Sequence, residues 1–204
     1  MIGQTFIINI AERADRWAEV TAECERVGIE NPIRIDAVTG DNRPLAFNQS
    51  QHKAIKAGIA TGAAFTVLED DCVFTNGLPI PQWLPAWDII YWGCNIIGND
   101  VTVWQMPVRV MPGLFRLYNS WQSHAISYSL QMAQWIDEHL DSTVISSSQH
   151  IYDDWLRTAV MPYFNVYVVA PMIAYQRPSR SDIWNNEADY TGCFKQGNEY
   201  LNSH

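Results

Sequence analysis

The first 35 residues of the chain restrict its fold more than any other segment does. Residues 5–10 form an apolar run of the kind that is typical of buried strands. Residues 15–28 favour an amphipathic helix, and residues 32–35 favour a second strand. The apolar residues of the helix follow three- and four-residue spacing and are Trp17, Val20, Cys24 and Val27. This order predicts the βαβ unit of an α/β fold, with a mainly parallel sheet flanked by helices.

Three consecutive acids follow another apolar segment. Residues 65–68 favour a buried strand, Glu69-Asp70-Asp71 come next, and apolar residues resume at Cys72. A predicted helix that is capped by Asn48 or Ser50 and runs to residue 62 leads into this strand. The acids are therefore expected at the carboxyl end of a central strand, where open α/β sheets bind their ligands.

The charge of these acids indicates a cation. Two carboxylates ~4 Å apart repel each other by roughly 4 kcal/mol at an effective dielectric constant of ~20. Glu69 and Asp71 point to one side of a continuing strand, and Asp70 points to the other. Two acids on one side form half of a site for a hard metal ion. The alternative interpretation is that the acids cap the next helix or lie in water.

The rest of the chain predicts one domain over residues 1–204. Residues 41–47 are expected to form a loop that is broken by Pro44. The remaining predictions are strands at 88–92, 124–128 and 166–170, a hairpin of residues 101–110 and 114–117 beside the ligand cleft, a helix at 130–140, a linker at 142–149, a helix that starts at Asp153, and an irregular tail from residue 171 to 204.

Composition excludes several classes of protein. With 48% apolar and 17% charged residues, the chain is not expected to be disordered. A net charge of -9 argues against a general nucleic-acid binder, although a local basic patch stays open. The four cysteines lack metal-finger spacing, and Cys24 and Cys72 are expected as buried free thiols. The chain shows neither a signal peptide nor a membrane span, so we expect a cytoplasmic protein.

An ordered series of segments resembles the glycosyltransferase 25 family, which includes lipooligosaccharide and procollagen galactosyltransferases. In the first half of the chain, the segments of this series are Phe6-Ile7-Ile8-Asn9-Ile10 with Arg13, Asp15 and Arg16, then Ala37-Val38-Thr39-Gly40, then Ser50 and His52 with Gln51 inserted between them, and then Val67-Leu68-Glu69-Asp70-Asp71. In the second half they are Asp88-Ile89-Ile90-Tyr91 with Gly93, Ser123 to Tyr128 with Ala133, Asp153, Gln176, and Ser181-Asp182-Ile183. Order and approximate spacing hold over residues 5–183. The chain is shorter than typical members of the family, which leaves the acceptor open.

The resemblance implies a GT-A fold, a nucleotide-sugar donor such as a UDP-hexose, and Mn²⁺ or Mg²⁺. Glu69 and Asp71 would be the metal ligands, and Asp70 would contact the ribose or the sugar of the donor. The residues that would bind the nucleotide or its phosphates are Asn9, Arg13 and Arg16. Arg177 and Arg180 form a second basic pair that is suited to phosphates.

Transfer also requires a base that removes a proton from the acceptor hydroxyl. Asp153 and Asp154 are the candidates, and their alternative role is that of ordinary acids in the first turn of a helix. His124 would contact phosphate or sugar, or else be structural, and His52 has the same two interpretations. Gln176 and Asp182 would close the donor site from the tail. The resemblance implies inversion at the transferred sugar and an acceptor such as a glycan.

Three other hypotheses stay open. A glycosyltransferase that acts on hydroxymethylated bases in DNA would share the donor site, but it would need a basic acceptor cleft. A non-catalytic nucleotide-sugar-binding module would keep the fold and lose the base. A metal-dependent phosphohydrolase would need a second cluster of acids and histidines, which the sequence lacks.

Overall fold

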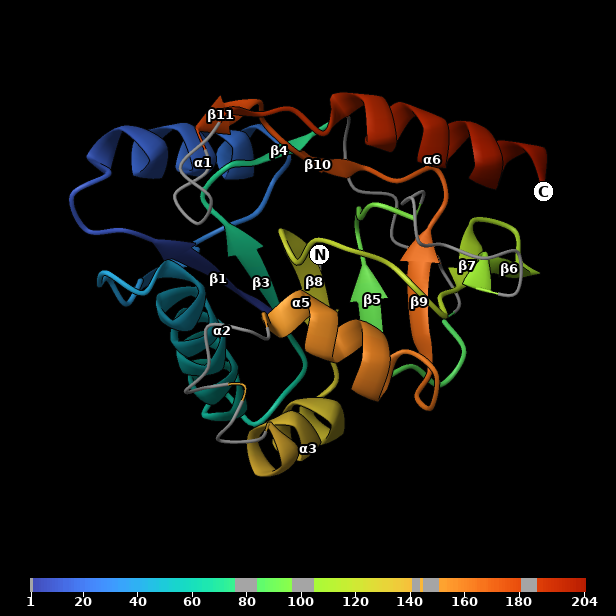
Figure 1. Ribbon diagram of the computed structural model, residues 1–204, viewed down its shortest axis with the longest axis horizontal. Coiled ribbons are helices and arrows are strands. Elements are labelled where there is room, and N and C mark those ends of the chain that lie inside the picture. Colours follow the sequence, from blue (N-terminus) through green and yellow to red (C-terminus); the bar gives the residue numbers. More distant parts are fainter. Residues whose placement is uncertain (1, 76–83, 97–104, 141–143, 145–150, 181–186) are drawn as a thin grey trace.

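The computed structural model describes residues 2–75, 84–96, 105–140, 144, 151–180 and 187–204 (Figure 1). An eight-stranded sheet in the order β2-β1-β3-β8-β5-β9-β7-β6 forms its centre. Its strands are β1 (Gln4–Asn9), β2 (Ile33–Asp36), β3 (Phe65–Glu69), β5 (Ile89–Tyr91), β6 (Val108–Met111), β7 (Leu114–Arg116), β8 (Ala125–Tyr128) and β9 (Val166–Val169). Two-stranded ribbons are formed by β4 (Cys72–Phe74) with β10 (Ala174–Gln176), and by β11 (Ser179–Arg180) with β12 (Glu187–Ala188).

The sheet is mixed but mainly parallel, as the sequence predicts. β1 pairs in parallel with both β2 and β3, and β5 pairs in parallel with β9. β8 lies between β3 and β5 and is antiparallel to both, so β3 and β5 run in the same direction. The carboxyl ends of β1, β2, β3, β5 and β9 therefore meet at one edge, which is the upper edge in Figure 1.

Helices cover both faces of the sheet (Figure 1). They are α1 (Ala14–Arg26), α2 (Arg43–Ile59), α3 (Leu130–His139), α5 (Tyr152–Trp155), which continues into the π-helical turn η2 (Leu156–Val160), and α6 (Thr191–Ser203). One apolar cluster joins the sheet to α2, α3, α5 and η2. A second joins the other face to α1 and the β4–β10 ribbon.

Alternation along the strands explains the two clusters. Phe6 and Ile8 of β1 belong to the first cluster, whereas Ile7 between them belongs to the second. Ile7, Phe65 and Leu68 are 0% exposed. Burial of one such side chain contributes about 1.5–3 kcal/mol to the stability of the fold. Cys24 and Cys72 are buried free thiols, as predicted.

Helix α2 starts earlier than predicted, so the prediction of a loop at residues 41–47 is wrong from residue 43 onward. The helix begins at Arg43, and the Asn42 side chain accepts a hydrogen bond from Leu45 N at 3.2 Å. Pro44 lies in the first turn, where a missing N–H costs nothing because it would have no intrahelical partner. Neither Asn48 nor Ser50 caps the helix. Both lie buried within it.

Two predictions for the second half of the chain need correction. The hairpin β6–β7 exists and lies at the sheet edge, but β8, β5 and β9 separate it from β3. Its predicted position beside the ligand cleft is therefore wrong for the described residues. The tail from residue 171 is not irregular either, because its described residues form β10, β11, β12 and the 13-residue helix α6. Most of the predicted linker 142–149 and part of the tail lie outside the described residues.

Candidate active site

The acidic triplet lies where the sequence predicts it, at the carboxyl end of β3. Glu69 is the last residue of the strand, and Asp70 and Asp71 form the turn into β4. Strand β10 fixes this turn, because Gln176 pairs with Cys72 and the Arg177 N–H donates to the Asp71 carbonyl at 2.9 Å. The pairing brings the Gln176 side chain next to the acids.

Asp70 holds together the ends of two elements. Asn9 at the end of β1 donates its Nδ2 to Asp70 Oδ2 at 2.7 Å. Arg16 of α1 donates its Nη1 to Asp70 Oδ1 at 3.1 Å, and both side chains of this ion pair are about one-tenth exposed or less. Buried charges persist only when they are paired in this way. Asp70 therefore fixes the position of the Arg16 guanidinium at the end of β3.

Glu69 and Asp71 face a shared partner, although β3 ends at Glu69 and the turn, rather than strand alternation, places Asp71. Gln176 Nε2 lies 3.5 Å from Glu69 Oε2 and 3.5 Å from Asp71 Oδ2. The other oxygen of Glu69 accepts from Ser123 Oγ at 2.8 Å and from Gln51 Nε2 at 3.2 Å. Asp71 Oδ1 is buried and has no hydrogen-bond partner among the described residues.

Because Glu69 and Asp71 are buried close together, their simultaneous ionisation is unfavourable. Burial, together with the charge of Asp71, raises the pKa of Glu69 to about 8. Burial and the charge of Asp70 raise the pKa of Asp71 to about 6, although Arg16 opposes the shift. The hydrogen bond from Ser123 lowers the pKa of Glu69 and does not cancel the other effects. At neutral pH the pair therefore tends to retain a proton, and it favours an added cation.

A cavity of about 380 Å³ opens in front of the acids, within the size range of small-molecule sites. Its walls come from β1, the connection between β2 and α2, the inner side of α2, the acidic turn, the segment before β8 and the C-terminal strands. The polar side chains that line it are Asn9, Arg16, Thr39, Arg43, Ser50, Gln51, Glu69, Asp70, Asp71, Gln122, Ser123, Asp153, Gln176, Arg177, Ser179 and Tyr190.

The two candidate bases are separated by the structure. Asp153 lines the cavity, accepts the backbone N–H of Gln122 at Oδ2 at 3.2 Å, and has a pKa that is raised mainly by burial. Asp154 belongs to no part of the cavity wall among the described residues, and its Oδ1 pairs with Arg157 Nη2 at 2.7 Å. Of the two candidates, Asp153 is therefore the one that lines the cavity.

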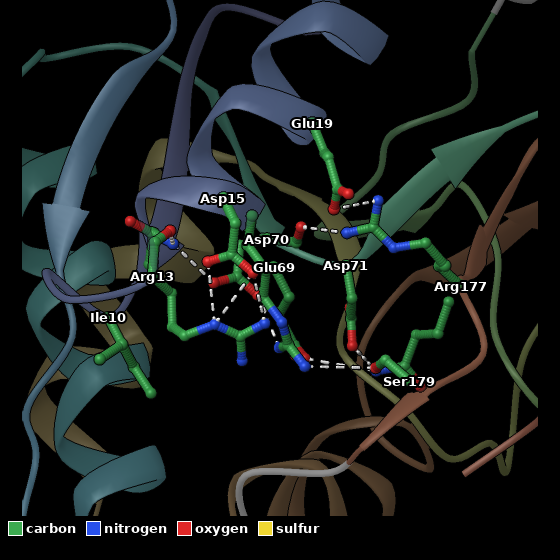
Figure 2. Close-up of polar contacts among 12 residues, drawn as sticks. Ile10, Arg13, Asp15, Glu19, Glu69, Asp70, Asp71, Arg177 and Ser179 are labelled. Carbon is green, nitrogen blue, oxygen red and sulfur yellow. Dashed lines mark hydrogen bonds and ion pairs between the residues drawn. The ribbon is translucent and has the colours of Figure 1, made fainter. Parts of the chain in front are cut away.

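Of the arginines that were predicted to contact phosphates, some line the cavity, whereas Arg13 does not. Arg16 and Arg177 line the cavity, and Arg177 bridges α1 and the acidic turn, with Nη1 2.6 Å from Glu19 Oε2 and Nη2 3.4 Å from the Asp70 carbonyl (Figure 2). Arg13 points instead to Asp15, at 2.8 Å, and is outside the described cavity lining. Arg43, in the first turn of α2, adds a third lining arginine that the sequence analysis did not single out.

Both candidate histidines lie away from the cavity wall that the described residues form. His124 is 1% exposed, and burial lowers its pKa to about 4, so the ring is neutral at physiological pH. His52 Nε2 lies 2.6 Å from Asp137 Oδ1 and joins α2 to α3. Gln51, the inserted neighbour of His52, reaches Glu69 instead. Asp182 lies outside the described residues.

Besides Arg43, the sequence analysis assigned no role in the site to Gln122, Ser123 or Tyr190, although Ser123 belongs to one of the landmark segments. Gln122 and Ser123 precede the antiparallel strand β8, whose start adjoins the end of β3. Tyr190 precedes α6, and burial with the charges of Asp153 and Asp71 raises the pKa of its hydroxyl. No local pattern marks these residues, because only tertiary pairing brings them to the acids. The spacing of Phe194, Gly197 and Leu201 could have indicated α6.

Glu69 and Asp71 offer oxygen ligands that suit Mg²⁺ or Mn²⁺. Within the described ranges, no group of three or more His, Cys, Asp or Glu side chains is placed to hold a metal ion. Mg²⁺ in proteins is often held by one or two carboxylates, with phosphate oxygens and water completing its coordination. The unpartnered Asp71 Oδ1 and the raised pKa values of the pair therefore fit a cation that a phosphate-bearing ligand helps to bind.

Comparison with known proteins gives a likeness of fold. The chain is similar to the crystal structure of a glycosyltransferase that is involved in glycosylation of the major capsid of PBCV-1, with a TM-score of 0.55, 9% sequence identity, and coverage of 99% of this chain and 100% of that one. A nucleoside-diphosphate-sugar pyrophosphorylase from Vibrio cholerae RC9 matches with a TM-score of 0.45, 10% identity, and coverage of 81% and 72% of the two chains.

Comparison at the level of sequence found no match. No protein-family model matches the chain, and no curated protein matches its sequence. None of the described helices combines the length and the apolar character that crossing a membrane requires. The similarity to the PBCV-1 glycosyltransferase and the sheet topology together show that the chain has a GT-A-like α/β fold with a mixed, mainly parallel sheet.

Proposed function

We propose that the chain is a glycosyltransferase that transfers a hexose from a nucleoside-diphosphate sugar, such as a UDP-hexose, to an acceptor hydroxyl with the help of Mn²⁺ or Mg²⁺. One observation carries the proposal. One cavity at the carboxyl ends of β1 and β3 is lined by the Glu69–Asp71 pair, three arginines and the separate carboxylate of Asp153. The likeness to a glycosyltransferase over nearly the whole chain supports the same class of reaction.

Glu69 and Asp71 would hold the cation. When bound, the cation would supply positive charge against the diphosphate that leaves the sugar. Arg16 and Arg177 line the same cavity and add fixed positive charge for the phosphates. Asp70 contributes through Arg16, because their buried ion pair fixes the guanidinium before a ligand arrives. Asn9 supports Asp70 from the end of β1.

Asp153 would act as the base. In this reaction the acceptor oxygen bonds to the anomeric carbon, the bond from that carbon to the diphosphate breaks, and Asp153 takes the hydroxyl proton. Burial raises the pKa of Asp153 toward the range in which a carboxylate accepts a proton efficiently. Attack from the side opposite the diphosphate would invert the anomeric centre. Membership in glycosyltransferase family 25 and a glycan acceptor are part of the proposal, supported by the ordered landmarks in the sequence.

A panel of nucleotide sugars tests the proposal. Thermal unfolding and donor hydrolysis are measured for UDP-, GDP- and dTDP-hexoses, each with Mn²⁺, with Mg²⁺ and with EDTA. We expect one donor to stabilise the protein only when a divalent cation is present, by about 2.7 kcal/mol at 100 times its Kd. A lack of response to every donor in both metal conditions would rule out the transferase and a nucleotide-sugar-binding module alike.

A further inference from the structure

Two side-chain amides connect the acid pair to Asp153. Gln176 Nε2 lies 3.5 Å from an oxygen of Glu69 and from one of Asp71. The oxygen of the same amide accepts from Gln122 Nε2 at 2.7 Å. The backbone N–H of Gln122 donates to Asp153 Oδ2 at 3.2 Å. A continuous chain of hydrogen bonds therefore crosses the cavity from the acids to the candidate base.

The backbone of Gln122 is held in an uncommon conformation. Its φ is 75°, in the left-handed region that few residues other than glycine adopt. The flanking residues fix it, because Trp121 exchanges two 3.0 Å backbone hydrogen bonds with Asn95 and the His124 carbonyl accepts from Glu69 N at 3.0 Å. Such strain costs on the order of 1–3 kcal/mol and is concentrated at functional sites. It aims the Gln122 N–H at Asp153 while its side chain reaches Gln176.

The orientation of the Gln176 amide depends on what lies between the carboxylates. In the structure, the Gln176 nitrogen faces the two acids, and the carboxylate oxygens act as acceptors. A divalent cation at this position would repel the N–H groups and attract the carbonyl oxygen. The two ends of an amide have nearly the same shape, so rotation about its last torsion exchanges them without moving the backbone. The Gln122 amide can rotate as well and accept from the reversed Gln176 nitrogen.

We propose that Gln176 is a further ligand of the divalent cation, supplied when its amide rotates, and that Gln122 positions the rotated amide. The inference rests on the proposed function, from which it takes the cation. The present contacts of Gln176 with the acids are 3.5 Å long, at the outer limit of a hydrogen bond, so rotation sacrifices little. A carbonyl oxygen on a cation in an enclosed cavity gains more, because electrostatic interactions are stronger there.

Mn²⁺ binding to the full chain tests the proposal, with free Mn²⁺ measured by electron paramagnetic resonance, with and without UDP. Gln176→Leu keeps the volume and removes both ends of the amide. We expect it to weaken Mn²⁺ binding about tenfold or more, in the range known for residues that support metal sites. Gln122→Gly suits the positive φ and retains the N–H to Asp153, so it removes only the partner of Gln176. It should weaken binding less than Gln176→Leu.

The outcomes separate this inference from the proposed function. The exposed residue Gln134 on α3 gives the control Gln134→Leu, which should bind Mn²⁺ as the wild type does. Equal or tighter binding by Gln176→Leu would overturn the inference, because the amide would then be only a competitor of the cation. If the wild type itself binds no Mn²⁺ with or without UDP, the metal part of the proposed function fails instead.

A second measurement follows the amides directly. Mg²⁺ is diamagnetic, so the side-chain ¹⁵N–H signals of Gln176 and Gln122 can be observed while it is added. We expect both pairs of signals to shift together, in proportion to the bound Mg²⁺, whereas the signals of Gln134 stay in place. Saturation with Mg²⁺ that leaves both amides unshifted would overturn the rotation.

Discussion

The three acids of the site differ in whether a neighbouring side chain compensates their negative charge. Asp70 is matched, with one oxygen on Arg16 and the other on Asn9. Glu69 and Asp71 have no cationic side chain at hydrogen-bond distance in the described contacts, and their pKa values rise to about 8 and about 6. The three adjacent acids thus divide into one structural residue and two that gain from an added cation. From the sequence, Glu69 and Asp71 were expected on one side and Asp70 on the other as a contact to the donor, but the pairing of Asp70 with Arg16 could not be predicted because the two residues are 54 positions apart.

The raised pKa of Glu69 predicts how stability depends on pH without metal. Between about pH 4.5 and pH 8, the folded protein retains a proton on Glu69 that the unfolded chain has lost, so the free energy of unfolding falls as pH rises. Glu69→Gln removes this dependence. At pH 8 in EDTA the variant should be more stable than the wild type by more than about 1 kcal/mol, since one pKa unit corresponds to about 1.4 kcal/mol.

Urea denaturation at pH 5 and pH 8 measures this difference. Glu138→Gln, on an exposed position of α3, is the matched control and should follow the wild type at both pH values. Added Mn²⁺ should stabilise the wild type and leave Glu69→Gln unaffected. A wild type that becomes more stable from pH 5 to pH 8 in EDTA, by an amount that Glu69→Gln abolishes, would contradict the predicted sign.

Asp153 and Asp154 form a natural pair of variants for the base. Asp153→Asn should lower the rate of transfer by about 100-fold or more, because general base catalysis contributes about 10²–10⁴-fold. Its affinity for the donor should change little. Asp154→Asn breaks only the pair with Arg157 and should retain most of the transfer activity. Rates with saturating donor and donor Kd values separate the two effects, and a larger loss in Asp154→Asn would reverse the assignment.

At the scale of elements, the sequence predicted those helices and strands whose own residues show a clear apolar pattern. The strands near residues 5–10, 65–68, 88–92 and 166–170 have strong apolar runs, and the structure has strands there. The predicted start of α2 is too late because a proline usually indicates a break in a helix, whereas Pro44 lies in the first turn, where proline is compatible with the helix. Strands β10 and β11 are three and two residues long, too short for an alternating pattern, and tertiary pairing defines them.

The start of α2 gives a prediction at this scale. Asn42 accepts the Leu45 N–H, and the residues that follow it in the helix line the cavity with Arg43 and Ser50. Asn42→Ala should cost about 1 kcal/mol of stability, as is typical for the loss of a helix cap. Asn42→Asp keeps an acceptor and adds a favourable charge at the helix N-terminus, so it should be neutral or stabilising. Urea midpoints measure both, and equal losses would show that the cap contributes nothing.

At the scale of the whole molecule, the site depends on close packing between distant segments. Gly93 follows β5, and a Cβ placed there would lie 1.7 Å from the Ala174 carbonyl of β10. Trp92 fastens the same segment, because its carbonyl accepts from both Ile173 N and Ala174 N. In the sequence, Gly93 was notable only as part of the series of segments that resembles the glycosyltransferase 25 family. The reason for a glycine there, the approach of a strand 81 residues later in the chain, is visible only in three dimensions.

Gly93→Ala should therefore displace β10 and with it Gln176. We expect a loss of roughly 1–3 kcal/mol, as for other overpacked sites, and a weaker stabilisation by Mn²⁺. Gly192→Ala in α6 is the control, because a Cβ there meets nothing within 4 Å and alanine favours a helix. Thermal unfolding with and without Mn²⁺ compares the two. A Gly93→Ala protein with wild-type stability would show that β10 can move away without cost.

The pairing of β10 with β4 also sets an order of events during synthesis. Gln176 and Arg177 leave the ribosome about a hundred residues after the acids that they contact, since the separations are 107 residues for Gln176–Glu69 and 105 for Gln176–Asp71. Long-range contacts of this kind form late, because the cost of closing the intervening loop precedes their benefit. A nascent chain with β1, α1, β2, α2 and β3 can begin its sheet while its acids are still open to water. The cavity in front of the acids is therefore completed only after β10 and the residues that follow it have been synthesised, so a shorter nascent chain is expected to lack the arrangement that the proposed donor site requires.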